Sequence, residues 1–178
     1  MSALASVRAA RATDAPAIGV VQAAVFEAAY GDVAPAAAQV APGELASVWR
    51  RSLQAPPAGA IALVACAGEQ VVGYAALAPS TDPDAPSGSL ELLSGGVHPS
   101  AREAGHGSRL LQACVDTARE TGAPLLLTWV LTVHEPVRAF LQSAGFGPDS
   151  ARRERSLGEG EPSVREVRLV TSLAEPAG

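Results

Sequence analysis

The residues best suited to bind a charged ligand lie in the middle of the chain, where an arginine precedes two closely spaced glycines. Arg102, Gly105 and Gly107 separate an apolar run at residues 90–97 from an amphipathic helical pattern. Glycine lets the backbone turn sharply and approach a ligand, because no Cβ is in the way. The first turn of the following helix directs unpaired N–H groups into this loop, at the positive end of the helix dipole. The pattern therefore predicts a site for a phosphate or pyrophosphate group.

Two other interpretations of the loop are open. In the first, the glycines only shape a turn between a strand and a helix. In the second, the loop is a dinucleotide-binding turn, which requires a third glycine where this chain has Leu110 and a direct junction with the strand, where residues 98–104 intervene. The dinucleotide interpretation therefore fits poorly. A Walker-type phosphate loop fits worse, because the chain has no Gly-Lys-Ser/Thr sequence.

The loop resembles the acetyl-CoA motif of the GNAT superfamily of N-acetyltransferases, which reads Arg or Gln, two residues, Gly, one residue, then Gly or Ala. Residues 97–99, 26–31 and 134–146 resemble further parts of the family pattern, in the expected order. The resemblance implies acetyl-CoA as co-substrate, with its pyrophosphate held by backbone N–H groups of the loop. The residues that it assigns to this binding are Leu93, Gly95, Val97, Arg102, Glu103, Ala104, Gly105, His106, Gly107, Ser108 and His134.

Acetyl transfer to an amine requires aligned substrates, a neutral amine and a hydrogen-bond donor for the oxygen on which charge develops. An alkyl ammonium group has a pKa near ~10, so only about one in a thousand is neutral at pH 7, and a base must take the proton. The resemblance makes Glu91 the candidate base and the Val97 N–H the candidate donor. The alternative for Glu91 is a solvent-facing carboxylate on a strand.

The closing segment departs from the family pattern at two positions. Leu141 stands where the family often has a tyrosine that protonates the departing thiolate, and its helical spacing with Val137 and Phe140 predicts a core residue. His134 stands at the position of a familiar asparagine. It is a candidate for the missing acid, but we favour a structural role as the cap of the helix that follows. Tyr30 is expected either in the acceptor cleft or in the core.

Composition and charge narrow the function classes. The 178 residues fit one domain, and 48% hydrophobic residues can fill its core. A net charge of −5 argues against general nucleic-acid binding, and no apolar run is long enough to span a membrane. Cys66 and Cys114 lack metal-ligand spacing, so they are expected to be buried thiols in a cytoplasmic protein without a metal. The arginines near 152–155 alternate with Glu154, which predicts a solvated strand or loop rather than a binding patch.

Apolar periodicity and turn residues predict the order β-α-α-β-β-β-α-β-α-β-β. The strands are expected at 7–12, 61–67, 71–78, 90–97, 125–132, 152–157 and 164–170. The helices are expected at 14–31, 44–54, 107–122 and 136–144, with Thr13 or Asp14 as the first cap. By resemblance this order is an α/β (α+β) fold, a mixed and mostly antiparallel sheet of about seven strands with helices on both faces. We expect one domain over residues 1–172 and a frayed tail at 173–178.

These observations predict an acetyl-CoA-dependent N-acetyltransferase that acts on a primary amine of a small molecule or peptide, by direct attack in a ternary complex. The alternative is an acyl-CoA-binding regulatory protein or degenerate relative with little transfer activity, which the absence of the tyrosine at Leu141 motivates. A homodimer is a further expectation from the resemblance.

Overall fold

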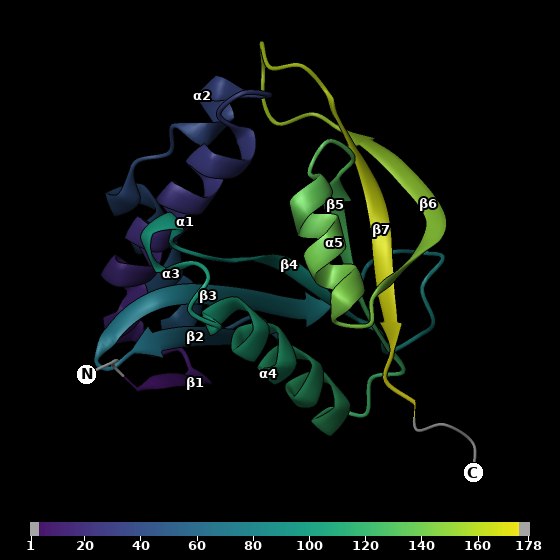
Figure 1. Ribbon diagram of the computed structural model, residues 1–178, viewed down its shortest axis with the longest axis horizontal. Helices are drawn as coiled ribbons and strands as arrows, with labels where there is room; N and C mark the ends of the chain where they lie inside the picture. The colour runs from purple at the N-terminus through teal and green to yellow at the C-terminus, as the bar shows by residue number, and fades with distance from the viewer. Residues whose placement is uncertain (1–3, 175–178) are drawn as a thin grey trace.

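A mixed seven-stranded sheet forms the centre of the molecule in the computed structural model, which describes residues 4–174 (Figure 1). The strand order is β1-β2-β3-β4-β5-β7-β6, and every neighbouring pair is antiparallel except β4 and β5. The strands are β1 (Ala5–Ala9), β2 (Ile61–Ala67), β3 (Gln70–Pro79), β4 (Leu90–Val97), β5 (Leu125–Leu131), β6 (Gly147–Arg155) and β7 (Val164–Ser172). The predicted α/β fold with a mostly antiparallel sheet is confirmed.

Helices cover the two faces of the sheet unequally. They are α1 (Ala15–Tyr30), α2 (Pro35–Ala38), α3 (Pro42–Gln54), α4 (His106–Glu120) and α5 (Glu135–Ser143). Figure 1 shows α1, α2 and α3 grouped at one side of the molecule, with α4 and α5 in front of the sheet. The α1 side packs on β2 and β3 through a cluster that includes Ile18, Val64 and Tyr74. This cluster reaches only the first half of the sheet, and on β6 and β7 the polar residues Arg153, Arg155, Glu166 and Arg168 pair with carboxylates or arginines instead.

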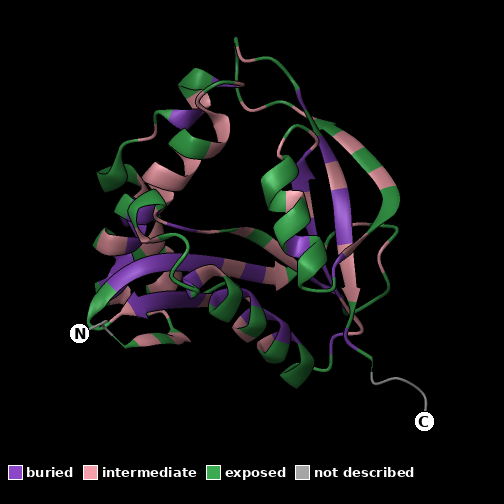
Figure 2. Cartoon of the chain, in the orientation of Figure 1, coloured by how far each residue is buried: buried purple, intermediate pink, exposed green. Residues whose placement is uncertain are grey.

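The larger apolar cluster lies under α4 and gives that helix its orientation. Leu110, Leu111 and Cys114 of α4 pack against Leu77 and Leu126 of the sheet. Leu173, predicted to begin the frayed tail, is buried in the same cluster, and its N–H donates to Pro124. Residues 175–178 of that tail lie outside the described residues. Figure 2 shows the buried positions concentrated in the central strands, as expected where both faces are covered.

Several predicted bounds shift by a few residues, and one local prediction is wrong. The strand expected at 7–12 is β1, at Ala5–Ala9, and the short helix α2 was not predicted. Asp14 occupies the N-cap position of α1 as predicted, but its side chain does not cap the helix: the carboxylate instead accepts from the Arg11 N–H at 2.7 Å and pairs with Arg8. The hydrogen bond from Arg8 lowers the pKa of Asp14, against the effect of burial. The carboxylate therefore stabilises the turn before the helix.

Cys66 and Cys114 are buried free thiols, as predicted. Burial raises the pKa of the Cys114 thiol to about 12, which leaves it unreactive at neutral pH. Within residues 4–174 no helix is both long and apolar enough to cross a membrane.

Candidate active site

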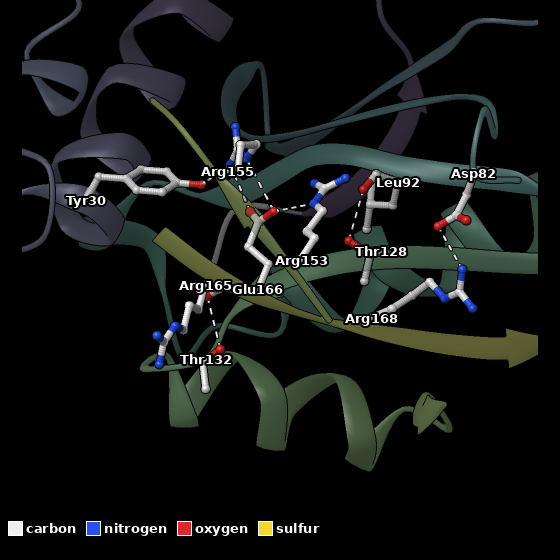
Figure 3. A network of polar contacts seen from close by, with 10 residues as sticks. All are labelled: Tyr30, Asp82, Leu92, Thr128, Thr132, Arg153, Arg155, Arg165, Glu166 and Arg168. Carbon is white, nitrogen blue, oxygen red and sulfur yellow. Dashed lines mark hydrogen bonds and ion pairs between the residues drawn. The ribbon is translucent and has the colours of Figure 1, made fainter. Parts of the chain in front are cut away.

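The parallel strands β4 and β5 separate soon after they begin, which opens a gap in the sheet. They pair only at Leu90 with Leu126 and at Glu91 with Leu127. The Thr128 hydroxyl then donates to the Leu92 carbonyl at 3.0 Å, and beyond this bond the two strands are not paired (Figure 3). The backbone polar groups that face the gap are thus left for a ligand, because buried N–H and C=O groups otherwise need partners.

The backbone of β4 changes register at the start of this gap. Leu92 pairs with Leu77 of β3 and Ser94 with Ala76, so that Leu93 is an extra residue at a bulge, and it is 58% exposed. In an antiparallel ladder successive residues direct their N–H groups to opposite sides. The His98 N–H donates to Val72 of β3, so those of Gly95 and Val97 face the side from which β5 has diverged.

Gly96 brings β4 close to helix α1. A Cβ at this position would lie 2.8 Å from the methyl carbons of Val25. The backbones of β4 and α1 therefore approach closely at Gly96, three residues after the bulge at Leu93.

The loop between β4 and α4 directs unused backbone donors toward one place. Gly105, at φ 79°, is the N-cap of α4, and no side chain caps this helix. Within the described residues, the N–H groups of residues 103–108 make no hydrogen bond. The buried His106 ring also leaves Nδ1 without a partner in this part of the structure. This arrangement fits a phosphate group at the positive end of the helix dipole.

The Nε of Arg102 donates to the Val97 carbonyl at 3.3 Å, so only part of its guanidinium is free to face the loop. That bond ties the loop to the end of β4. Glu103 and Ala104 are exposed, and Glu103 has a positive φ of 64°. Ser108 is exposed on the first turn of α4. The structure thus brings all seven predicted loop residues, 102–108, to one turn beside the gap.

Helix α5 closes the other side of the gap. Leu141 is buried in the large apolar cluster, as predicted, but Val137 and Phe140 are 41% and 38% exposed and are not core residues. The Phe140 ring approaches Gly107, where an added Cβ would lie 3.6 Å from it. His134 is half-buried at the start of α5 and makes no capping hydrogen bond through its side chain, so the favoured capping role is wrong.

Glu91 lies on the sheet face opposite α4, in a hollow of about 410 Å³. Its neighbours Leu90 and Leu92 face the α4 cluster, so the alternation of the strand turns Glu91 to the other side. Trp129 and Arg153 line the same hollow. Burial raises the pKa of Glu91, an effect that the Arg153 charge opposes and the Asp82 and Glu166 charges reinforce. Glu91 is therefore a half-buried carboxylate and does not simply face solvent.

A polar network beside Glu91 was not predicted from the sequence. Glu166 of β7 is almost fully buried and pairs with Arg153 at 2.6 Å and with Arg155 at 2.8 Å (Figure 3). The Arg153 guanidinium lies 4.3 Å from the centre of the Trp129 ring. The interpretation of residues 152–155 as a solvated segment is therefore wrong for Arg153 and Arg155, which face the site, although Arg152 and Glu154 are exposed.

A second arginine of this face is held by two carboxylates. Arg168 pairs with Asp82 and with Asp149, each at 2.7 Å. Burial would raise the pKa of both acids, but the Arg168 hydrogen bond and charge bring them below their usual range. Because Asp82 belongs to the loop between β3 and β4, this pair fixes one wall of the hollow.

Tyr30 is not a core residue and lies beside Arg155, at the edge of the network around Glu166. Its hydroxyl accepts from Arg155 at 3.3 Å, and the ring is half-buried. Tyr74 is the core tyrosine: burial raises its pKa to about 12, and its hydroxyl lies 2.7 Å from that of Ser94. Alternate residues of a strand share a face, which groups Arg153 with Arg155, but the sequence alone does not show that their face meets a buried carboxylate.

Comparisons with known proteins agree with this geometry. A scan against protein families matches residues 26–146 to the acetyltransferase (GNAT) family. A search of curated proteins found no match.

Solved structures share the fold over nearly the whole chain. The structure of yncA from Salmonella typhimurium, which contains its cofactor acetyl-CoA, has a TM-score of 0.72 and 21% identity, covering 98% of this chain and 96% of that one. The ribosomal-protein-alanine N-acetyltransferase from Brucella melitensis has a TM-score of 0.72 and 22% identity, covering 94% and 99%. An N-acetyltransferase from Staphylococcus aureus Mu50 has a TM-score of 0.70 and 18% identity, covering 96% and 99%.

Proposed function

The chain belongs to the acetyltransferase (GNAT) family, and we propose that it transfers the acetyl group of acetyl-CoA to a primary amine of a small molecule or peptide. The observation that carries this proposal is the gap between β4 and β5, which ends at the uncapped first turn of α4. Such a gap exposes backbone groups along one side and anion-binding N–H groups at its end. Acetyl-CoA supplies the acyl group there as co-substrate.

The residues that would hold the donor divide into two sets. The N–H groups of residues 103–108 would bind the pyrophosphate, because no hydrogen bond within the described chain uses them. The backbone of Leu93, Gly95 and Val97 would line the pantetheine arm, with the exposed Val137 and Phe140 on its other side.

Glu91 is the proposed base. Its carboxylate makes no hydrogen bond within residues 4–174, and it opens into the hollow on the face away from α4. A raised pKa makes it a stronger base than an ordinary glutamate, which suits a group that removes a proton near neutral pH. In the transfer, the amine nitrogen bonds to the acyl carbon, the carbon–sulfur bond breaks, and its electron pair leaves with sulfur. The acceptor nitrogen gives up two protons, one from the ammonium to Glu91 before the attack and one as the carbon–sulfur bond breaks; the thiolate takes up one proton, and Glu91 releases the other to solvent.

Position 141 offers no tyrosine to protonate the thiolate, because it is a leucine buried among apolar residues. His134 is the proposed source of that proton, because its side chain is half-buried beside α5 and is not engaged in capping. Water is the alternative source. A thiol pKa near ~8.5 makes the thiolate a tolerable leaving group in either case.

A matched pair of glycine variants tests the donor site. Gly107 and Gly43 are each the second residue of a helix, α4 and α3. A side chain at Gly107 enters the space between Phe140 and Val97, whereas one at Gly43 meets nothing within 4 Å. Both changes to valine alter the helix propensity by the same small amount, below about 1 kcal/mol. We expect Gly107→Val to weaken acetyl-CoA binding at least tenfold by calorimetry and Gly43→Val to leave it unchanged. Equal binding by both variants would contradict the proposed site.

A second candidate function follows from Leu141. Without an efficient general acid to protonate the CoA thiolate, the protein would bind acyl-CoA and transfer little of the acyl group. Its role would then be to regulate a partner. The two functions differ in turnover: release of CoA thiol that depends on an added amine supports the transferase, and binding without release supports the regulator.

A further inference from the structure

The hollow beside Glu91 presents a guanidinium group with unused hydrogen-bond donors. Arg153 donates from Nε to Glu166 at 2.6 Å and makes no other hydrogen bond within residues 4–174. A guanidinium carries five N–H groups, so four of them, on the two terminal nitrogens, have no protein acceptor. Figure 3 shows these nitrogens pointing away from Glu166. The side chain is 38% exposed, so a ligand in the hollow can reach it.

The carboxylates around this guanidinium do not occupy all of its donors. Glu166 pairs with both Arg153 and Arg155, and Glu91 supplies a second negative charge that acts on Arg153 across the hollow. Arg168 differs, because two carboxylates surround it. A carboxylate can therefore bind at the Arg153 end of the hollow, where donors are unused, and is disfavoured at the Arg168 end, where two carboxylates already pair with the arginine.

The Arg153 group is also held in one orientation. Its guanidinium lies over Trp129, and its Nε bond to Glu166 sets the direction of the fork. A planar, fixed guanidinium matches the two oxygens of a carboxylate and loses little entropy on binding it. The group is thus prepared for a carboxylate before any ligand arrives.

Two contacts narrow the proposed acceptor site at the end where Arg155 lies. The Tyr30 hydroxyl bonds to Arg155, and the Ala36 N–H donates to Glu161 at 2.9 Å. These two contacts join the α1–α2 segment to the β6–β7 hairpin, as Figure 1 shows at the top of the molecule. A small ligand fits such a site better than a folded peptide segment.

We infer that the acceptor is a small aminocarboxylate, bound with its carboxylate on the terminal nitrogens of Arg153 and its amino group beside Glu91. The inference rests on the proposed function, which places the reacting amine at Glu91. Arg153 is then the residue that selects the acceptor, while Glu91 takes the proton.

Paired acceptors test the inference on the unaltered protein. Leucine, methionine and phenylalanine are each compared with the amine that lacks the carboxylate, since the chain and the reacting amine are otherwise alike. A charge-assisted hydrogen bond of about 1.5–3 kcal/mol predicts kcat/KM about ten- to a hundredfold higher for the amino acid. Equal or higher kcat/KM for the decarboxylated amines would overturn the inference.

Two arginine variants then locate the effect. Arg153→Met removes the fork, whereas Arg165→Met removes the same charge from the opposite face of β7, where Arg165 is 79% exposed beside Glu154. In Arg153→Met the ratio of kcat/KM for amino acid over amine is expected to fall toward one, through KM. In Arg165→Met the ratio is expected to stay at the wild-type value. The inference is wrong if Arg153→Met keeps that ratio while its thermal unfolding shows a folded protein.

Calorimetry separates this inference from the proposed function. Leucine, methionine and phenylalanine are titrated into the protein with CoA bound. A protein that binds acetyl-CoA but acetylates no amine would contradict the proposed transfer. The inference would still be supported if the wild-type protein binds the amino acids and Arg153→Met weakens that binding tenfold or more. It would be overturned if the wild-type protein does not bind them, or if Arg153→Met binds them equally well.

Discussion

Replacing Glu91 with glutamine removes a proton acceptor from the hollow while keeping the shape of the side chain. Glu91 makes no hydrogen bond within the described residues, so the change leaves no partner unpaired. A positioned general base contributes about 10²–10⁴ in rate. We therefore expect kcat to fall by that factor, equivalent to about 2.7–5.5 kcal/mol of transition-state stabilisation.

The same variant should not be less stable, and this separates a lost base from a damaged fold. Burial raises the pKa of Glu91 above its unfolded value, so the folded protein binds the proton more tightly than the unfolded chain. Stability from this group then falls as pH rises from the ordinary glutamate value through the raised one. At pH 7–8 the ionised carboxylate opposes folding, and Glu91→Gln is expected to unfold at or above the wild-type temperature. The difference should vanish in acid, where both side chains are neutral.

The assay is the pH dependence of kcat/KM, with Glu69→Gln as control, because Glu69 is exposed at the turn between β2 and β3. Below the pKa of the amine, kcat/KM of the wild type and of Glu91→Gln should each fall about tenfold for every unit by which the pH is lowered. Below the raised pKa of Glu91, kcat/KM of the wild type should fall by a further tenfold per pH unit, because Glu91 itself becomes protonated. The Glu91→Gln protein should show no such additional fall. A kcat within threefold of wild type, with an unchanged profile, would refute the assignment.

Three further outcomes follow from the packing. Leu141→Tyr should destabilise the protein by about 1–3 kcal/mol in urea titration without raising turnover, because Leu141 is a packed core residue; a gain in kcat would contradict this. Thr128→Val should lower the free energy of unfolding by about 1–3 kcal/mol, because the Leu92 carbonyl loses its 3.0 Å donor where β4 and β5 diverge; a neutral effect would show that solvent replaces it. Cys66 and Cys114 should react with a thiol reagent only after unfolding, and rapid labelling of the native protein would contradict their burial.

The sheet and the loop could be predicted because their signals are local. Residues 61–67 and 90–97 are apolar runs that end at turn residues, and both have the predicted bounds. Gly105 has the positive φ that marks the start of α4. The short helix α2 escaped prediction because four residues give no helical period.

The network around Glu166 could not be predicted because its contacts join distant segments. Arg153 and Arg155 face inward only because Glu166 lies opposite them in β7 and Trp129 lies beneath Arg153 in β5. The bulge between Pro148 and Arg152, where Ser150 has a φ of 73°, also moved β6 to Gly147–Arg155 from the predicted 152–157. The role of His134 was misjudged for a simpler reason, because a polar residue before a helix need not turn its side chain to the helix end.

The most direct test of the central claim is to incubate the protein with acetyl-CoA carrying a ¹³C-labelled acetyl group and an amine mixture, and to follow the products by mass spectrometry. The account predicts a labelled N-acetyl amine formed in equal amount with free CoA, at a rate that Gly107→Val reduces and Gly43→Val does not. Free CoA without a labelled amide, or transfer unaffected by Gly107→Val, would contradict it.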